Sequence, residues 1–109
     1  MTNRELDALV AEKVMGWRRR EGRWLVPDRV YSRRNCPRYS TSIAAAWQVV
    51  ERFEERVAIE GPVTTSDIWR CSIWTSWDEN RESSVADTTS APRAICLAAL
   101  RAVGVGVED

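Results

Sequence analysis

Arginines and hydroxyl-bearing residues gather ahead of two segments that have the pattern of helices, one beginning near Ile43 and one near Pro92. Guanidinium groups bind phosphates through paired hydrogen bonds, and the unpaired N–H groups of a helix start favour an anion. An aromatic ring nearby would stack on a nucleobase. We therefore expect a site for a small phosphorylated ligand, with these candidate residues: Arg33, Arg34, Arg38, Tyr39, Ser40, Thr41, Trp74, Thr89, Ser90 and Arg93. Trp24 is a further candidate for stacking.

Each of these residues also has a purely structural interpretation. Ser and Thr oxygens cap helices by accepting hydrogen bonds from backbone N–H groups of the first turn. Arginines on a loop are commonly solvated. The pattern alone leaves both interpretations open.

The chain has no histidine, which excludes a Ser-His-Asp or Cys-His nucleophile and the common zinc sites. Four acidic residues could in principle hold Mg²⁺, but their spacing follows no known ligand pattern: Asp78, Glu79, Glu82 and Asp87. We expect no catalytic residue, no metal and no cofactor.

The 109 residues fit one domain, residues 1–109. Sixteen basic and sixteen acidic residues balance, so we expect no nucleic-acid partner. No apolar run has the length of a membrane span, and the first 16 residues are too charged for a secretory signal, so we expect a cytoplasmic protein. Cys36, Cys71 and Cys96 are odd in number and lack metal-site spacing, which predicts free thiols, buried at the last two positions.

Three helices are expected. Thr2-x-x-Glu5 is a capping box, followed by an apolar stripe that ends at Gly16. The second helix should begin within residues 40–42 and run to about Arg56, with one face in the core, formed by Ile43, Ala46, Trp47, Val50 and Phe53. Pro92 suits the first turn of the third helix, which Gly104 ends.

Strands are expected at residues 23–26, 57–63 and 67–77, the last with alternating faces. Residues 18–22 have the composition of a charged turn, and residues 78–90 that of an exposed loop. Four or five of the six tryptophans should lie in the core. The predicted fold is α+β: a small single-domain α-β-α sandwich with a mostly antiparallel sheet and about three helices.

Three blocks of the chain resemble the phage ABA-sandwich domain family: NRELDALVAEKVMGW at residues 3–17, PRYSTSIAAAW at 37–47 and APRAICLAAL at 91–100. The resemblance implies a small tailed-phage or prophage protein with an α-β-α layered domain. The family carries no assigned reaction or catalytic residue. Its members usually have an aspartate at the position of Ser42, so the role of that carboxylate is absent here.

Two functions are compatible with these observations. In the first, a non-catalytic phage protein sequesters a nucleotide immune signal, a cyclic nucleotide or a cyclic ADP-ribose isomer, and so counteracts bacterial defence as a homodimer or higher homo-oligomer. The link to such sponges is an analogy of phage origin and size. In the second, an accessory module binds a host or phage protein through a surface that carries tryptophans.

Overall fold

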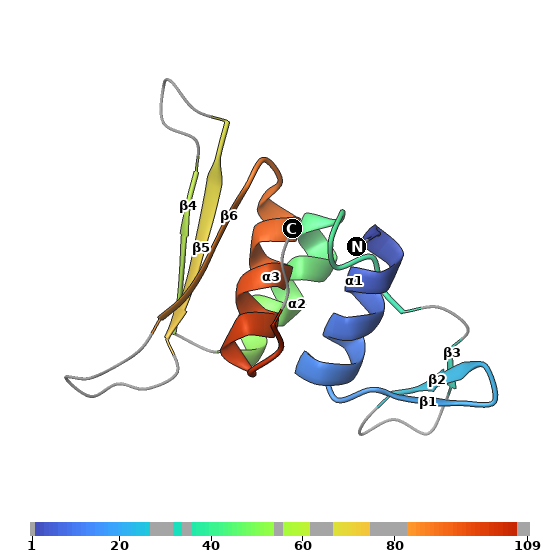
Figure 1. Ribbon diagram of the computed structural model, residues 1–109. Helices are drawn as coiled ribbons and strands as arrows, with labels where there is room; N and C mark the ends of the chain where they lie inside the picture. The colour runs from blue at the N-terminus through green and yellow to red at the C-terminus, as the bar shows by residue number, and fades with distance from the viewer. Residues whose placement is uncertain are drawn as a thin grey trace.

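A computed structural model describes residues 2–26, 32–33, 36–53, 56–61, 67–74 and 83–106 (Figure 1). Of the sequence candidates, Arg34, Asp78, Glu79 and Glu82 lie outside these ranges, as does the side chain of Arg33. Trp77 and the side chains of Ser83 and Ser84 also lie outside them. The helical elements are α1 (Asn3–Leu9), continued by the π-helical turn η1 (Val10–Val14), α2 (Ile43–Arg52) and α3 (Ala91–Ala102).

Local sequence signals fix the helix starts. The capping box of α1 is present, with the Glu5 N–H donating to Thr2 Oγ1 and the Thr2 N–H donating to Glu5 Oε2. Ser42 caps α2 through the Ala45 N–H, and Ser90 caps α3 through the Arg93 N–H. The predicted helix starts are confirmed, whereas α2 ends at Arg52 rather than near Arg56.

The larger sheet has the strand order β4-β5-β6, formed by β4 (Val57–Glu60), β5 (Trp69–Trp74) and β6 (Ser83–Thr88), all antiparallel. The alternation predicted for β5 is confirmed, because Cys71 and Ile73 are buried and Arg70 is exposed. The prediction of a loop over residues 78–90 was wrong at β6. That strand has little apolar pattern of its own, and it is defined by pairing with β5 and by the burial of Ala86 and Thr88.

The smaller sheet is an arginine-rich hairpin with a short third strand, formed by β1 (Arg18–Arg20), β2 (Arg23–Leu25) and β3 (Ser32–Arg33). The prediction of a charged turn over residues 18–22 was wrong for β1. Only Glu21 and Gly22 form the turn, both at positive φ (52° and 75°), as expected for a two-residue hairpin loop. Charged side chains are tolerated in β1 because all three residues are exposed.

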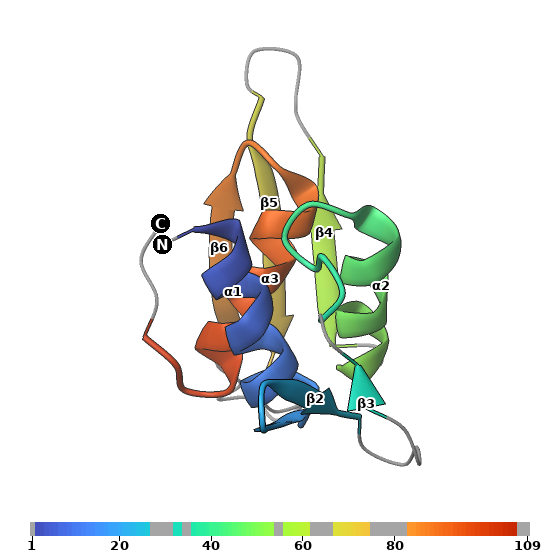
Figure 2. The ribbon, with the colours of Figure 1, turned by 90° about the vertical axis from the view of Figure 1, so that its right-hand side faces the viewer.

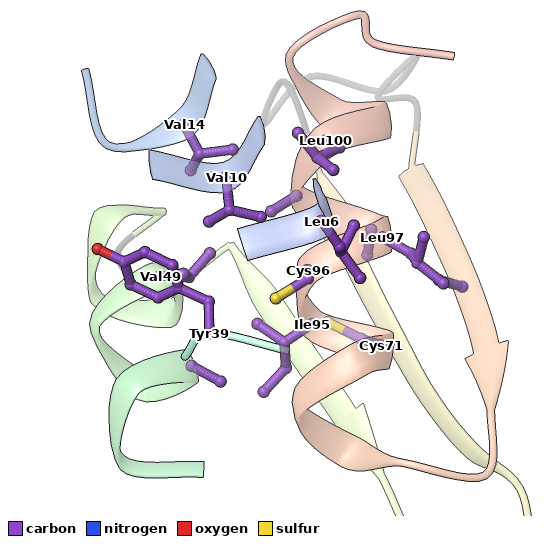
Figure 3. Packing of buried hydrophobic residues seen from close by; sticks show 14 of the residues in the cluster. Leu6, Val10, Val14, Tyr39, Val49, Cys71, Ile95, Cys96, Leu97 and Leu100 are labelled. Carbon is purple, nitrogen blue, oxygen red and sulfur yellow. The ribbon is translucent and has the colours of Figure 1, made fainter. Parts of the chain in front are cut away.

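Figure 1 shows the three helices on one side of the β4-β5-β6 sheet, with the hairpin sheet beyond α1. Helix α3 packs on β5 and β6, and α2 and α1 pack on α3. The core lies between these layers, and Figure 3 shows part of it, including Leu6, Val10, Tyr39, Val49 and Ile95. The α+β class, three helices and antiparallel sheets are thus confirmed.

The apolar face of α2 is divided between the core and the surface. Ala46, Val49 and Phe53 are buried, but Ile43 is 54% exposed and Trp47 is 51% exposed. The prediction that Ile43 and Trp47 belong to the core was wrong, because α2 packs against α3 along only part of its apolar face.

The prediction that most tryptophans lie in the core was also wrong. Of the five described tryptophans, only Trp17 and Trp24 are buried, Trp69 and Trp74 are half-buried, and Trp47 is exposed.

Candidate functional site

The three helices run in the same direction, so that their N-terminal ends lie at one end of the molecule (Figures 1 and 2). The partial positive charges of the three helix starts are therefore gathered on one side.

Hydrogen bonds hold these helix starts together. The buried Asp7 carboxylate accepts from the Ser40 N–H at 2.7 Å, and the Ser40 hydroxyl donates to the Asn3 carbonyl at 3.3 Å. From α3, Arg93 Nη1 donates to Asn3 Oδ1 at 2.6 Å. The turn before α2 and the first turn of α3 are thus both fixed to the first turns of α1.

A polar groove of about 910 Å³ opens beside these contacts. Its basic residues come from three segments: Arg4 from α1, Arg19 from β1 and Arg38 from the turn before α2. The groove is also lined by Thr2, Asn3, Glu5, Asp7, Trp24, Cys36 and Thr41. A volume of this order suits a nucleotide-sized ligand.

The two carboxylates of the groove are engaged by backbone amides. Asp7 accepts from Ser40, and Glu5 accepts from Thr2. Among the described residues, the structure records no ion pair for Arg4 or Arg38. The groove therefore has guanidinium donors at its walls, while its two carboxylates form hydrogen bonds with the protein's own backbone.

The one tryptophan of the groove is packed on two sides. Arg19 Cζ lies 5.4 Å from the centre of the Trp24 ring, and the Trp17 ring meets Trp24 edge-on with 6.3 Å between centroids. Trp24 is only 4% exposed. The flat cation of Arg19, rather than the indole of Trp24, is therefore the surface available to a base.

The structure brings together part of the predicted site. Arg38 and Thr41 line the polar groove, and Arg93 reaches its edge through Asn3. Ser40 is buried directly beneath, where its N–H and hydroxyl serve the contacts to α1. Tyr39 is fully buried in the core, so its ring is not presented to a ligand.

Other predicted residues lie elsewhere. Ser90 caps α3, and Thr89 is exposed beside it, but neither lines the polar groove. Trp74 follows the buried Ile73 in β5, so its side chain lies on the face of the sheet opposite that of Cys71 and Ile73. For Arg33 only the backbone, in β3, is described.

Sequence reasoning missed Arg4 and Arg19 as groove residues. Arg4 stands on an amphipathic helix and Arg19 in a run of three arginines, where solvation is the ordinary expectation. No local sequence signal distinguishes Arg4 and Arg19 from solvated arginines, because the two residues come together only through the packing of the hairpin beside α1.

The three cysteines are free thiols, as predicted. Burial raises the pKa of Cys71 to about 12 and raises the pKa of Cys96 as well. Partial burial, followed by the negative charge of Asp7, raises the pKa of Cys36 in the polar groove. The Cys36 thiol is therefore protonated at neutral pH and is a poor nucleophile.

A second, apolar groove of about 610 Å³ lies between α2 and β4. Its α2 wall consists of Ile43, Trp47 and Val50, one turn apart. Val57 and Ile59 of β4 form the opposite wall, and Trp69, Ala91 and Pro92 complete the lining. The exposed part of the α2 apolar face is thus one wall of a groove.

A sequence profile of the phage ABA sandwich domain matches residues 8–100. The chain belongs to this family. The match covers α2, most of α3 and every described strand of both sheets, so the family assignment rests on most of the fold.

A crystal structure of a phage protein from Bacillus cereus ATCC 14579 is similar to this ABA sandwich protein. The two share 26% sequence identity with a TM-score of 0.78 over 99% of this chain and 93% of the other. No curated protein matches the chain. Within the described residues, no helix has the length and apolar character needed to cross a bilayer.

Proposed function

We propose that this ABA sandwich protein binds a small phosphorylated ligand in the polar groove and holds it without altering it. The ligand class is that of cyclic nucleotides and cyclic ADP-ribose isomers, the immune signals of bacterial defence. Sequestering such a signal in the host cytoplasm would protect a phage. The observation that carries the proposal is the meeting of Arg4, Arg19 and Arg38 around one groove at the helix N-termini.

The charges support an anionic ligand. Phosphate oxygens accept hydrogen bonds from guanidinium groups, and each such charge-assisted hydrogen bond is about twice as strong as one between neutral groups. Arg38 stands on the turn that leads into α2 and Arg4 in the first turn of α1, so both guanidinium groups add to the positive ends of helices. Arg19 would stack on the base while Arg4 and Arg38 contact phosphates.

The lining supports binding rather than turnover. Its thiol is protonated at neutral pH, and both of its carboxylates accept hydrogen bonds from backbone N–H groups. Hydrolysis of a phosphodiester would need an activated nucleophile or a metal.

Isothermal titration with a panel of cyclic dinucleotides and cyclic ADP-ribose isomers tests the proposal. We expect saturable binding of at least one member, which is recovered chemically intact after the protein is denatured. Arg38→Ala should weaken binding by about tenfold or more, because a hydrogen bond to a charged group contributes about 1.5–3 kcal/mol.

Arg20→Ala is the control, since Arg20 is an exposed arginine next to the groove residue Arg19 in β1 but does not line the groove. Affinity that is unchanged in Arg38→Ala, or a product in place of the intact ligand, would contradict the proposal.

Binding of a host or phage protein is the second candidate function. The apolar groove supports it, because exposed Ile43 and Trp47 are exceptions to the usual burial of large apolar side chains. The homo-oligomer expected from the sequence stays a prediction.

A further inference from the structure

The apolar groove is bounded on one side by an edge strand. In the order β4-β5-β6, β4 pairs with β5 on one side, and no described strand pairs with it on the other. The Trp74 N–H donates to the Arg56 carbonyl at 3.0 Å. In an antiparallel ladder, hydrogen-bonded and non-hydrogen-bonded pairs alternate. The backbone N–H and C=O groups of Ala58 and Glu60 therefore also point toward β5. Those of Val57 and Ile59 lie in the plane of the sheet and point away from β5, at the edge of β4.

The same two residues direct their side chains into the groove. Val57 and Ile59 pair with Ile73 and Cys71, both of which are buried on the helix side of the sheet. The groove thus combines outward-pointing backbone donors and acceptors with apolar side chains at alternate positions of the same strand.

Helix α2 supplies the opposite wall. It packs on α3, and α3 packs on β5 and β6, which leaves β4 beside the groove. Figure 2 shows α2 beyond the edge of β4, so that an additional strand would lie under the helix. Ile43, Trp47 and Val50 would then cover the side chains of that strand.

We propose that this groove binds an extended segment of another protein, which pairs antiparallel with β4 as an added strand. Addition of a strand at a sheet edge derives affinity from main-chain hydrogen bonds and specificity from pockets for alternate side chains. This inference rests on the second candidate function and is independent of ligand binding in the polar groove.

Charge on the face of the sheet opposite the helices defines the segment further. Glu60 is exposed at the end of β4, whereas Arg56 precedes β4 and its Nε donates to the Phe53 carbonyl at 3.3 Å. An antiparallel partner meets Glu60 first, so it should carry a basic residue, an apolar residue, any residue, a second apolar residue and then any residue, in that order. Opposite charges facing each other across strands are favourable.

The chain's own residues 56–60 have this pattern, yet a second copy is a poor occupant. Pairing of two β4 strands would bring both α2 helices to the same side of the joined sheet, where the first α2 already extends past the edge (Figure 2). A segment without a flanking helix fits under α2.

A fluorescent seven-residue peptide with the sequence Ser-Arg-Val-Ala-Ile-Glu-Ser tests the inference by anisotropy. We expect saturable binding that Trp47→Ala weakens by about tenfold or more, as is common for a tryptophan at an interface centre. Gln48→Ala, the exposed neighbour on α2, should leave affinity unchanged. N-methylation of the Val and Ile of the peptide removes the two N–H donors aimed at β4 and should abolish binding.

Three outcomes would overturn the inference. They are absence of binding to the folded protein, binding that is indifferent to N-methylation, and a dimer of the protein alone that dissociates in Trp47→Ala, which would assign the groove to a second copy. Arg38→Ala should retain peptide binding, so a failure here is distinguishable from a failure of the nucleotide proposal.

Discussion

At the scale of single residues, Arg70 and Asp87 form a bidentate pair on the face of the larger sheet opposite the helices. Arg70 Nε donates to Asp87 Oδ1 at 2.8 Å, and Arg70 Nη2 donates to Oδ2 at 3.1 Å. The two residues face each other across β5 and β6. Hydrogen bonds from Arg70 lower the pKa of Asp87 from its ordinary value of 3.8.

A lowered pKa in the folded state has a definite pH signature. The ion pair stabilises the fold at pH values above 3.8, and this contribution is lost as the pH falls through the lower pKa of the folded protein. We expect the carboxyl carbon of Asp87 to titrate below 3.8 by NMR and to return toward 3.8 in Arg70→Gln. The same midpoint in both proteins would show that Arg70 does not control this carboxylate. The effect on stability should be small and salt-sensitive, because both side chains are exposed.

The thiols should differ in their reactivity toward a disulfide reagent at about pH 8. Cys36 is half-buried and should react slowly in the native protein. Cys71 and Cys96 are buried with raised pKa values and should react only as the protein unfolds. Counting the modified thiols by mass spectrometry, with and without denaturant, checks this order. Rapid modification of Cys96 in the native state would be incompatible with its burial in the core.

Among the candidate residues, the sequence identified those that stand at helix starts. Ser42 and Ser90 cap helices, which is a local property, whereas Arg38 and Thr41 line the polar groove together with residues that are distant in the sequence. Tyr39 was misjudged for the same reason. Its position beside a helix start is local, but its burial in the core depends on packing with residues that are distant in the sequence.

At the scale of elements, Asp7 connects α1 to the turn that leads into α2. Its carboxylate accepts the Ser40 N–H inside the protein. Asp7→Ala would leave a buried N–H without an acceptor, which costs about 1–3 kcal/mol. We expect this loss in the free energy of unfolding measured by urea denaturation.

Asp7→Asn is the matched variant, because its side-chain oxygen still accepts the Ser40 N–H. It should lose less stability than Asp7→Ala. Equal stability of the wild-type protein and Asp7→Ala would mean that this hydrogen bond contributes nothing to the junction between α1 and α2.

Hydrophobic periodicity predicted where helices lie better than it predicted which of their apolar residues are buried. A period of 3.6 residues identified α2 and its apolar side, but it could not show that half of this side faces a groove, which depends on the distance between α2 and β4. In β6, residues 83–88 lack the apolar alternation of a strand. Pairing with β5 overrides that weak local preference.

At the scale of the whole molecule, the phage ABA sandwich fold gathers three helix N-termini at one end and places all three helices on one face of its larger sheet (Figure 1). The two grooves differ in chemistry: one is lined by arginines and the other by apolar side chains. The fold thus offers two separate grooves, which we propose as the sites for an anionic ligand and for an extended peptide. The α+β class followed from the pattern of helices and strands and the family from three sequence blocks, whereas both grooves arise from packing between distant segments.

Our central claim is that the polar groove holds a phosphorylated ligand, and an NMR titration of ¹⁵N-labelled protein tests it most directly. The ligand is the member of the nucleotide panel that raises the melting temperature most, as expected for binding to the native state alone. We predict saturable shifts in the amide signals of residues 2–8 and 36–42, with little change at residues 57–60. Shifts confined to β4 and α2 around the apolar groove, or no saturable shift with any member of the panel, would contradict the account.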